Sequence, residues 1–288
     1  MSQPATNPRR HFTSFDCGGR TLDLQRAAIM GVLNVTPDSF FDGGRFISRD
    51  SALRYAEEMV DSGADIIDVG GESTRPGAQP VEAQQELDRV IPIIEALHDS
   101  VDIPISIDTS KPEVMREAVT AGAGLINDVF ALRANGALPA AAATGVPVCV
   151  MHMQGEPRTM QQNPYYEAVV PEVMGFLSAR LEACVHAGIP REKVIVDPGF
   201  GFGKTVTHNL TLLRNLTELT TLGVPVLVGL SRKRMIGELL GLPVDERAAA
   251  SVTLVLKAVE NGANIVRVHD VKMTRDAVRL MEIINMLD

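Results

Sequence analysis

Polar side chains of the kinds that bind and transform substrates follow each of eight short apolar segments in this chain. In chain order they are Asn34, Glu72 with Ser73 and Thr74, Asp108, Asn127, His152, Asp197, Ser231 with Lys233, and Arg267 with His269. Carboxylates and amides accept the N–H groups of a heterocycle, whereas Arg, Lys and His bind anions such as phosphate. The set predicts a site for a flat, hydrogen-bonding heterocycle together with an anionic group.

The glycine-rich motif "DPGFGFGKT", which begins at Asp197, resembles a phosphate-binding loop without having its spacing. A Walker loop has Gly, four residues, then Gly-Lys-Ser/Thr, and its backbone N–H groups surround a phosphate. Pro198 stands where the first Gly is required, and proline has no N–H to donate. The three glycines also lack the G-x-G-x-x-G spacing of dinucleotide-binding loops. The motif therefore predicts a sharp turn after an acidic strand end.

Composition narrows the class of protein. The chain has 288 residues, with 27 basic against 36 acidic side chains and no long basic block, so a nucleic-acid partner is not expected. Three cysteines without paired spacing fit the reducing cytoplasm. The first residues lack the apolar segment of a signal peptide, and no apolar run is long enough to cross a membrane. We therefore expect a cytoplasmic globular protein.

Eight β-branched segments alternate with longer segments that carry apolar residues at helical spacing. The β-branched segments are residues 27–34, 65–71, 103–110, 125–129, 146–153, 193–199, 224–232 and 264–270. Helices are predicted between them, for example at 53–63, 87–100 and 251–262, and six glycines just before strands predict left-handed helix caps. Eight such units in about 260 residues predict a (β/α)8 barrel, with a doubly wound open sheet as the alternative.

We predict one barrel domain at residues 12–288, after a disordered tail at residues 1–11. Alternating residues around Cys17-Gly18-Gly19 predict a β-hairpin that closes the floor of the barrel. The carboxyl ends of the strands of such a barrel meet at one mouth, where active sites are built. The polar residues described above are therefore expected to converge there.

Each polar residue also has a structural explanation, because Asp, Asn and Ser are common in turns and helix N-caps. Their presence at all eight strand ends favours a site. Asn127 and Asp128 are adjacent on a strand, so at most one faces the mouth directly. Cys149 and His152 are predicted on opposite faces, which disfavours a metal pair. Ser231 lies in "GLSRK", which lacks the second Gly of a nucleophile elbow.

Eight sequence strings, in order, resemble those of the bacterial dihydropteroate synthase family: "GVLNVTPDSF", "DVGGESTRPGA", "IDTSKPEV", "INDV", "MHMQGEP", "DPGFGFGK", "GLSRKRMIG" and "RVHDV". The resemblance runs from about residue 12 to the C-terminus. It implies an enzyme of folate biosynthesis that condenses 6-hydroxymethyl-7,8-dihydropterin diphosphate with 4-aminobenzoate to give 7,8-dihydropteroate and diphosphate. It also implies dissociative substitution, in which diphosphate leaves before the amine attacks, with Mg²⁺ as cofactor and a homodimer as the assembly.

The resemblance assigns roles to individual residues. The expected catalytic residues are Asp108, Lys233, Arg267 and His269. The expected pterin site comprises Asp108, Asn127, Met151, Asp197, Phe202 and Lys233, with Met151 and Phe202 against the ring faces. The diphosphate site comprises Asn34, Thr74, Arg267 and His269, with Mg²⁺ held near Asn34. The 4-aminobenzoate pocket comprises Phe40, Thr74, Arg75, Pro76, Ser231 and Lys233.

One departure from the family and two rival functions bear on these assignments. Phe41 stands where the family usually has a small polar residue, so the sensitivity to sulfonamides is left open. One rival is a related barrel that transfers a methyl group from methyltetrahydrofolate to a corrinoid protein. The other is a pterin-binding paralogue that has lost catalysis. Arg267 with His269 and the "ESTRP" string favour the synthase, because they serve a diphosphate and an aminobenzoate.

Overall fold

Eight parallel strands form a closed barrel in the computed structural model, which describes residues 12–36, 49–73, 79–156 and 159–286. The strands are β3 Ala28–Asn34, β4 Ile66–Gly70, β5 Ile105–Asp108, β6 Leu125–Asp128, β7 Val148–Met151, β8 Val194–Asp197, β9 Leu227–Val228 and β10 Ile265–Val268. Their order is β8-β7-β6-β5-β4-β3-β10-β9, and a parallel bridge between Val196 and Val226 closes the ring from β8 to β9. The predicted (β/α)8 barrel is confirmed, and the closed ring excludes the open sheet.

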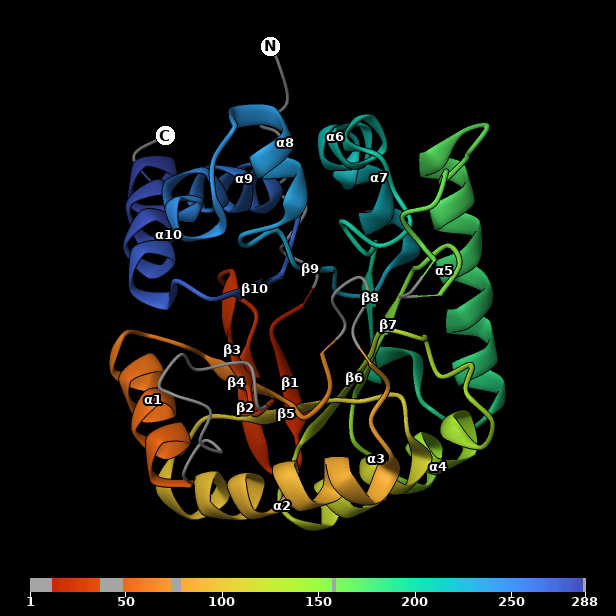
Figure 1. Cartoon of the computed structure of the whole chain (residues 1–288), viewed down its shortest axis with the longest axis vertical. Helices are drawn as coiled ribbons and strands as arrows, with labels where there is room; N and C mark the ends of the chain where they lie inside the picture. The colour runs from red at the N-terminus through yellow and green to blue at the C-terminus, as the bar shows by residue number, and fades with distance from the viewer. Residues whose placement is uncertain (1–11, 37–48, 74–78, 157–158, 287–288) are drawn as a thin grey trace.

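Helices surround the strands on all sides (Figure 1). They are α1 Arg49–Asp61, α2 Ala83–Ser100, α3 Pro112–Thr120, α4 Ala137–Thr144, α5 Val169–His186, α6 Val206–Arg214, α7 Leu216–Leu219, α8 Arg234–Leu240, α9 Ala248–Glu260 and α10 Val271–Asn285, with 3₁₀ turns η1 Arg191–Lys193, η2 Thr220–Leu222 and η3 Val244–Glu246. The three helices predicted from periodicity correspond to α1, α2 and α9, and the six predicted cap glycines all have positive φ. Within the described residues, no helix combines the length and apolar character that crossing a membrane requires.

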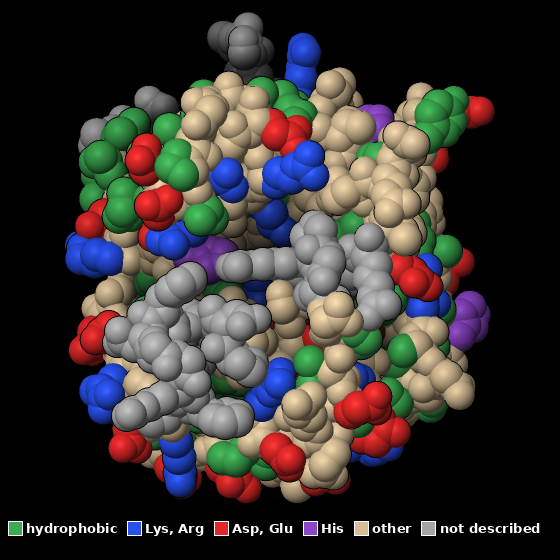
Figure 2. Space-filling model, viewed as in Figure 1, with side chains coloured by type: hydrophobic (Ala, Val, Ile, Leu, Met, Phe, Trp, Pro, Cys, Tyr) green, Lys and Arg blue, Asp and Glu red, His purple; other side chains and the backbone are tan. Residues whose placement is uncertain are grey.

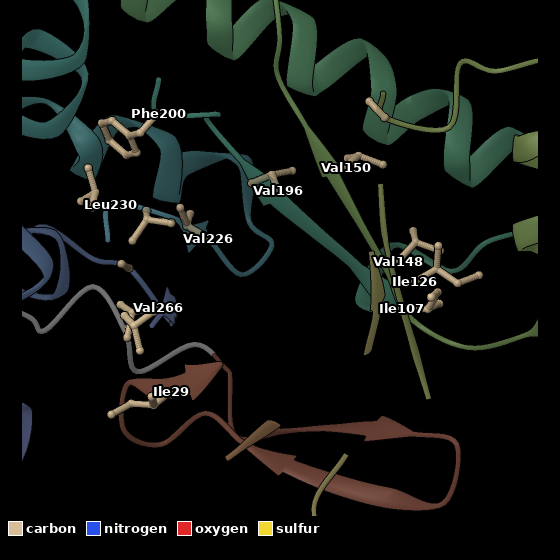
Figure 3. Packing of buried hydrophobic residues seen from close by; sticks show 14 of the residues in the cluster. Ile29, Ile107, Ile126, Val148, Val150, Val196, Phe200, Val226, Leu230 and Val266 are labelled. Atoms are coloured by element: carbon tan, nitrogen blue, oxygen red, sulfur yellow. The ribbon is translucent and has the colours of Figure 1, made fainter. Parts of the chain in front are cut away.

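The main apolar core lies between the outer surface of the barrel and the helices. Alternate strand residues such as Ile107, Val150 and Val266 point outward into this layer (Figure 3). Because successive side chains of a strand point to opposite faces, the residues between them point into the barrel. The strands are apolar outward except at Asp128, and their inward polar residues, such as Asp68 and Asp108, lie between the middle and the carboxyl end of each strand.

The N-terminal hairpin closes the opposite end of the barrel. β1 (Ser14–Cys17) and β2 (Arg20–Asp23) pair antiparallel around Gly18 and Gly19, which have φ of 65° and 87°. Hairpin residues such as Phe15 and Leu22 pack against the inward side chains at the start of the barrel strands. A side chain on Gly124 would place its Cβ 2.0 Å from the Cys17 carbonyl oxygen, so the hairpin and the barrel are in backbone contact. The predicted barrel floor is confirmed.

Candidate active site

The inward faces of strands β5, β6 and β8 bring three polar side chains together at the barrel mouth. In the strand register Gly70 is opposite Asp108, Asp108 is opposite Asn127, and Met151 is opposite Asp197. Asp108, Asn127 and Asp197 are all buried, with exposed fractions of 8%, 5% and 6%. The structure therefore brings together the three residues expected on the pterin edge.

Arg267 enters this group from β10 and binds two carboxylates. Its Nε donates to Asp68 Oδ2 at 2.5 Å, and its Nη2 donates to Asp108 Oδ2 at 2.9 Å. Burial lowers the pKa of Arg267, but the two carboxylates together outweigh it, so that the pKa lies above its ordinary value. Burial raises the pKa of Asp108 well above its usual range, and Arg267 partly offsets the rise. The guanidinium is thus fixed in the mouth as a permanent cation.

Asp68 is a site residue that the sequence analysis missed. It is fully buried, and its Oδ2 also accepts Asn127 Nδ2 at 3.2 Å. Its Oδ1 has no hydrogen-bond partner among the described residues. Asp68 lies in the middle of β4, whereas the predicted site residues lie at strand ends. The signal that identifies it is a charged residue at an inward position of an otherwise apolar strand.

Asp197 and Lys233 are buried charged groups that each favour the ionised form of the other. Asp197 Oδ1 accepts the backbone N–H of Gly199 at 2.7 Å. Burial raises the pKa of Asp197 to about 6, although the Gly199 N–H and the cations Lys233, Lys204 and Arg267 oppose the rise. Burial lowers the pKa of Lys233 to about 8. Both groups are therefore mainly ionised at neutral pH.

An apolar wall lines the mouth beside these charges. Met151 and Phe202 belong to one buried cluster, with Val129, Met153 and Met160. The Lys233 ammonium lies 4.4 Å from the centroid of the Phe202 ring, which is within cation–π range. The two residues expected against the pterin ring faces are therefore adjacent to the polar edge groups.

The residues expected to bind diphosphate come from neighbouring strands. The backbone N–H of His269 donates to Ser231 Oγ at 3.2 Å, and His269 Nδ1 lies 3.0 Å from the same oxygen. Burial lowers the pKa of His269 to about 4, so the ring is neutral at pH 7. Asn34, at the end of β3, lies beside Gly70 and Asp108. If Gly70 carried a side chain, its Cβ would lie 3.4 Å from Asn34 Oδ1 and 3.7 Å from Asp108 Cβ. Figure 2 shows cationic and His side chains gathered at the centre of this face.

Two polar strand-end residues do not face the mouth, which corrects the expectation of full convergence. His152 is buried behind the glycine-rich loop and contacts Lys204, with Nδ1 2.8 Å from Nζ. Glu72 forms an ion pair with Lys111, the residue directly before the N-terminus of α3. In both cases a nearby lysine provides a partner away from the barrel axis.

The structural interpretations of Asp128 and Cys149 are supported. Asp128 points away from the mouth and accepts the backbone N–H groups of Phe130 and Leu132. Cys149 packs in the inner cluster at the barrel floor, whereas His152 contacts Lys204 and Phe176, so the two side chains have different surroundings. The described residues contain no cluster of three or more His, Cys, Asp or Glu side chains that could hold a metal ion.

Several predicted residues lie outside the part of the chain that the structure describes. They are Phe40, Phe41, Thr74, Arg75 and Pro76, together with the N-terminal residues 1–11. The predictions for the 4-aminobenzoate pocket therefore concern Ser231 and Lys233 alone among the residues placed here.

Known proteins match this chain over nearly its whole length. A family described as pterin binding enzymes matches residues 30–269. The dihydropteroate synthase of Haemophilus influenzae is 54% identical over 263 residues, covering 91% of this chain and 96% of its own length. A Yersinia pestis dihydropteroate synthase in complex with a sulfonamide drug has a TM-score of 0.92 at 50% identity, covering 95% of this chain and 99% of that one.

A third similar protein has its product bound. The dihydropteroate synthase of Xanthomonas albilineans in complex with 7,8-dihydropteroate has a TM-score of 0.87 at 48% identity, covering 94% of this chain and 98% of that one. The identities and coverage extend over the barrel and every site strand described above. The chain belongs to the family of pterin binding enzymes, among the dihydropteroate synthases.

Proposed function

We propose that the protein condenses 6-hydroxymethyl-7,8-dihydropterin diphosphate with 4-aminobenzoate, giving 7,8-dihydropteroate and diphosphate. The observation that carries the proposal is the convergence of Asp108, Asn127 and Asp197 beside Lys233 and Arg267 in one buried mouth. The similar Xanthomonas albilineans enzyme binds 7,8-dihydropteroate, a compound that contains both the pterin and the aminobenzoate part.

The buried carboxylates and amide suit the edge of the pterin ring. The 2-amino group and the neighbouring ring N–H are parallel donors, and a carboxylate accepts two such donors at once. Asp197 is the strongest candidate for this pairing, because Gly199 occupies one side of its carboxylate and leaves acceptor capacity on the other. Lys233 then serves the pterin carbonyl, and Met151 and Phe202 enclose the ring.

When diphosphate leaves, negative charge develops on the leaving group and positive charge on the pterin methylene. The described residues include groups of opposite charge for each of the two. Arg267 and His269 are our candidates to bind the leaving group, on which negative charge develops, because fixed donors there would stabilise the transition state more than the ground state. The pterin methylene that remains becomes cationic. Asp108, with Asp68 behind the same guanidinium, provides the compensating negative charge. Attack by the amine of 4-aminobenzoate then needs no protein nucleophile.

Mg²⁺ fits this site as a partner of the substrate. It prefers oxygen ligands and is commonly held by one or two protein groups plus substrate phosphates and water. Asn34 offers an amide oxygen at the mouth, and the described residues have no metal cluster of their own. When bound, Mg²⁺ neutralises charge on the diphosphate. Asn34 would hold it at the end of β3, while Arg267 and His269 would bind the diphosphate from the end of β10.

We also propose a cytoplasmic homodimer that uses α10. This last helix exposes the apolar residues Met273, Leu280, Ile283 and Ile284, and Met286, which directly follows it, is exposed too. Figure 2 shows hydrophobic side chains gathered at the upper left of the face, where Figure 1 places α10. A contiguous exposed apolar surface of this kind favours a protein partner. Sedimentation of the purified protein tests the assembly, and a monomer at micromolar concentration contradicts it.

A turnover assay with both substrates tests the proposed reaction. We expect diphosphate release from the pterin diphosphate only when 4-aminobenzoate is present, with 7,8-dihydropteroate as the second product. Methyl transfer from methyltetrahydrofolate to a corrinoid protein identifies the first rival. Pterin binding without turnover in either assay identifies the non-catalytic paralogue.

A further inference from the structure

The glycine-rich loop contains a buried ammonium group that the proposed reaction does not use. Lys204 is 3% exposed. Its Nζ lies 2.8 Å from His152 Nδ1, 2.9 Å from Gly199 O, 3.0 Å from Phe202 O and 3.4 Å from His152 O. An ammonium has three N–H donors, and these neutral acceptors satisfy all of them. No ion pair to Lys204 occurs among the described residues, although burying a charge without one is costly.

This lysine differs from the lysine of a phosphate-binding loop in what surrounds it. In a Walker loop the backbone N–H groups and the lysine face the same phosphate. Here the carbonyl oxygens of Gly199 and Phe202 face the Lys204 ammonium, which fills the loop from inside. Positive φ at Gly199, Gly201 and Gly203 allows the chain to turn in this way. The loop is thus closed around its own cation.

Lys204 joins the loops that follow two neighbouring strands. The loop after β7 provides His152, and the loop after β8 provides the two carbonyl groups. The loops are also in backbone contact, since a Cβ on Gly199 would lie 1.9 Å from the His152 carbonyl oxygen. Lys204 therefore fixes the glycine-rich loop against the adjacent strand end.

The peptide groups that Lys204 fixes are those that orient the pterin residues. Gly199 makes two of these contacts. Its carbonyl oxygen accepts a hydrogen bond from Lys204 Nζ, and its N–H donates to Asp197 Oδ1 at 2.7 Å. Phe202 likewise accepts a hydrogen bond from Lys204 through its carbonyl oxygen, and its ring packs against the Lys233 ammonium. We propose that Lys204 is a positioning residue for the pterin site, which holds the Asp197 carboxylate and the Phe202 ring in their binding geometry. This inference rests on the proposed pterin-binding function.

The charge of Lys204 adds to its positioning role. The charged groups that face Asp197 are Lys204, Lys233 and Arg267, and each favours the ionised carboxylate. Burial lowers the pKa of Lys204 to about 7, so at pH 6 the ammonium form prevails. His152 stays neutral because burial and Lys204 lower its pKa to about 3. Removing the ammonium should therefore raise the pKa of Asp197.

The test compares Lys204→Met with Lys193→Met in otherwise unmodified full-length protein. Lys193 also donates to a backbone carbonyl, Gly145 O at 2.6 Å, but it stands before β8, at the end of the strand away from the mouth. We expect Lys204→Met to bind 6-hydroxymethylpterin roughly tenfold more weakly, while its affinity for diphosphate with Mg²⁺ changes less than about twofold. Lys193→Met should change neither. Equal losses for both probes, or full pterin affinity in folded Lys204→Met, overturn the proposal.

A pH profile separates positioning from general damage to the fold. In the unmodified protein, 6-hydroxymethylpterin affinity should fall as the pH drops through about 6, where Asp197 becomes protonated. In Lys204→Met the midpoint of this fall should move to higher pH. A loss of affinity that is uniform across pH contradicts the charge contribution and indicates a purely structural residue.

A second variant keeps the inference testable if Lys204→Met does not fold. His152→Phe removes the Nδ1 acceptor and keeps a ring against Phe176, whose centroid lies 4.9 Å from that of His152. We expect a selective loss of pterin affinity here too, smaller than for Lys204→Met, and unchanged affinity contradicts the link. If the unmodified protein itself fails to bind 6-hydroxymethylpterin, the proposed function is wrong and the failure is independent of Lys204.

Discussion

Replacement of Asp197 by Asn is the sharpest test of the pterin edge. The asparagine has nearly the same shape, and its amide oxygen can still accept the Gly199 N–H. Its NH₂ group, however, then faces an N–H of the pterin, so a charge-assisted hydrogen bond is lost and a donor is left unsatisfied. Together these cost about 2 to 4 kcal/mol of binding free energy. The dissociation constant for 6-hydroxymethylpterin should rise roughly 30- to 900-fold.

The pH dependence of 6-hydroxymethylpterin affinity is a second, independent test of the role of Asp197. With a pKa of about 6, Asp197 is mostly ionised at pH 7.5 and mostly protonated at pH 5. Because the carboxylate is the form that accepts the pterin donors, affinity should be full well above pH 6, decline around pH 6 and fall by about tenfold per pH unit well below it. Asp197→Asn should abolish this dependence.

Titration calorimetry of 6-hydroxymethylpterin at pH 5 to 7.5 measures both effects. Asp128→Asn is the matched control, since Asp128 is equally buried at a strand end but points away from the mouth, where it accepts hydrogen bonds from Ser110 Oγ and from the backbone N–H groups of Phe130 and Leu132. It should lower stability while leaving the pH midpoint of binding in place. Unchanged affinity in folded Asp197→Asn, or a preserved pH midpoint, refutes the assignment of Asp197 to the pterin edge.

Three further outcomes are expected. Arg267→Ala should weaken binding of diphosphate and the pterin diphosphate far more than binding of a free pterin, measured by calorimetry, and equal losses place Arg267 at the ring instead. A sulfonamide should bind at least roughly tenfold more tightly with diphosphate and Mg²⁺ present. The reason is that the first ligand orders loops rich in Gly, Pro, Asp and Ser, so that the second ligand loses less entropy on binding. Equal affinity in titration calorimetry indicates a preformed pocket. Gly124→Ala should lower the free energy of unfolding in urea by about 1 to 3 kcal/mol, since its Cβ collides with the Cys17 carbonyl, and unchanged stability contradicts the tight hairpin contact.

The sequence predicted the barrel and most of its mouth because both follow from short-range patterns. The polar residues at the strand ends predicted where the mouth lies, whereas the choice of Asp108, Asn127 and Asp197 for the pterin edge came from the family resemblance. The structure places the three at the same end of β5, β6 and β8. The hairpin at Gly18 and Gly19 was likewise a local signal.

The residues that were missed depend on contacts between distant segments. Asp68 acquires its role from Arg267, which lies 199 positions further along the chain. Lys204 and His152 acquire theirs from the packing of two loops, and the motif containing Lys204 gives no indication that its side chain turns inward. Sequence periodicity predicts which face of a strand a side chain is on. It does not predict which carbonyl groups accept hydrogen bonds from a lysine in a glycine-rich loop.

The bond between Asp68 and Arg267 also determines when during synthesis the site can exist. β10, which carries Arg267, pairs with β3, the first barrel strand, so the ring closes only when the last strand has been made. Contacts between such distant residues form late and slowly, because a long loop must close first. Until then Asp68 and Asp108 face each other without their cation. A nascent chain that stops before β10 therefore leaves β3 as an open edge of the sheet, and the two acids on β4 and β5 lack the guanidinium that they share in the finished barrel.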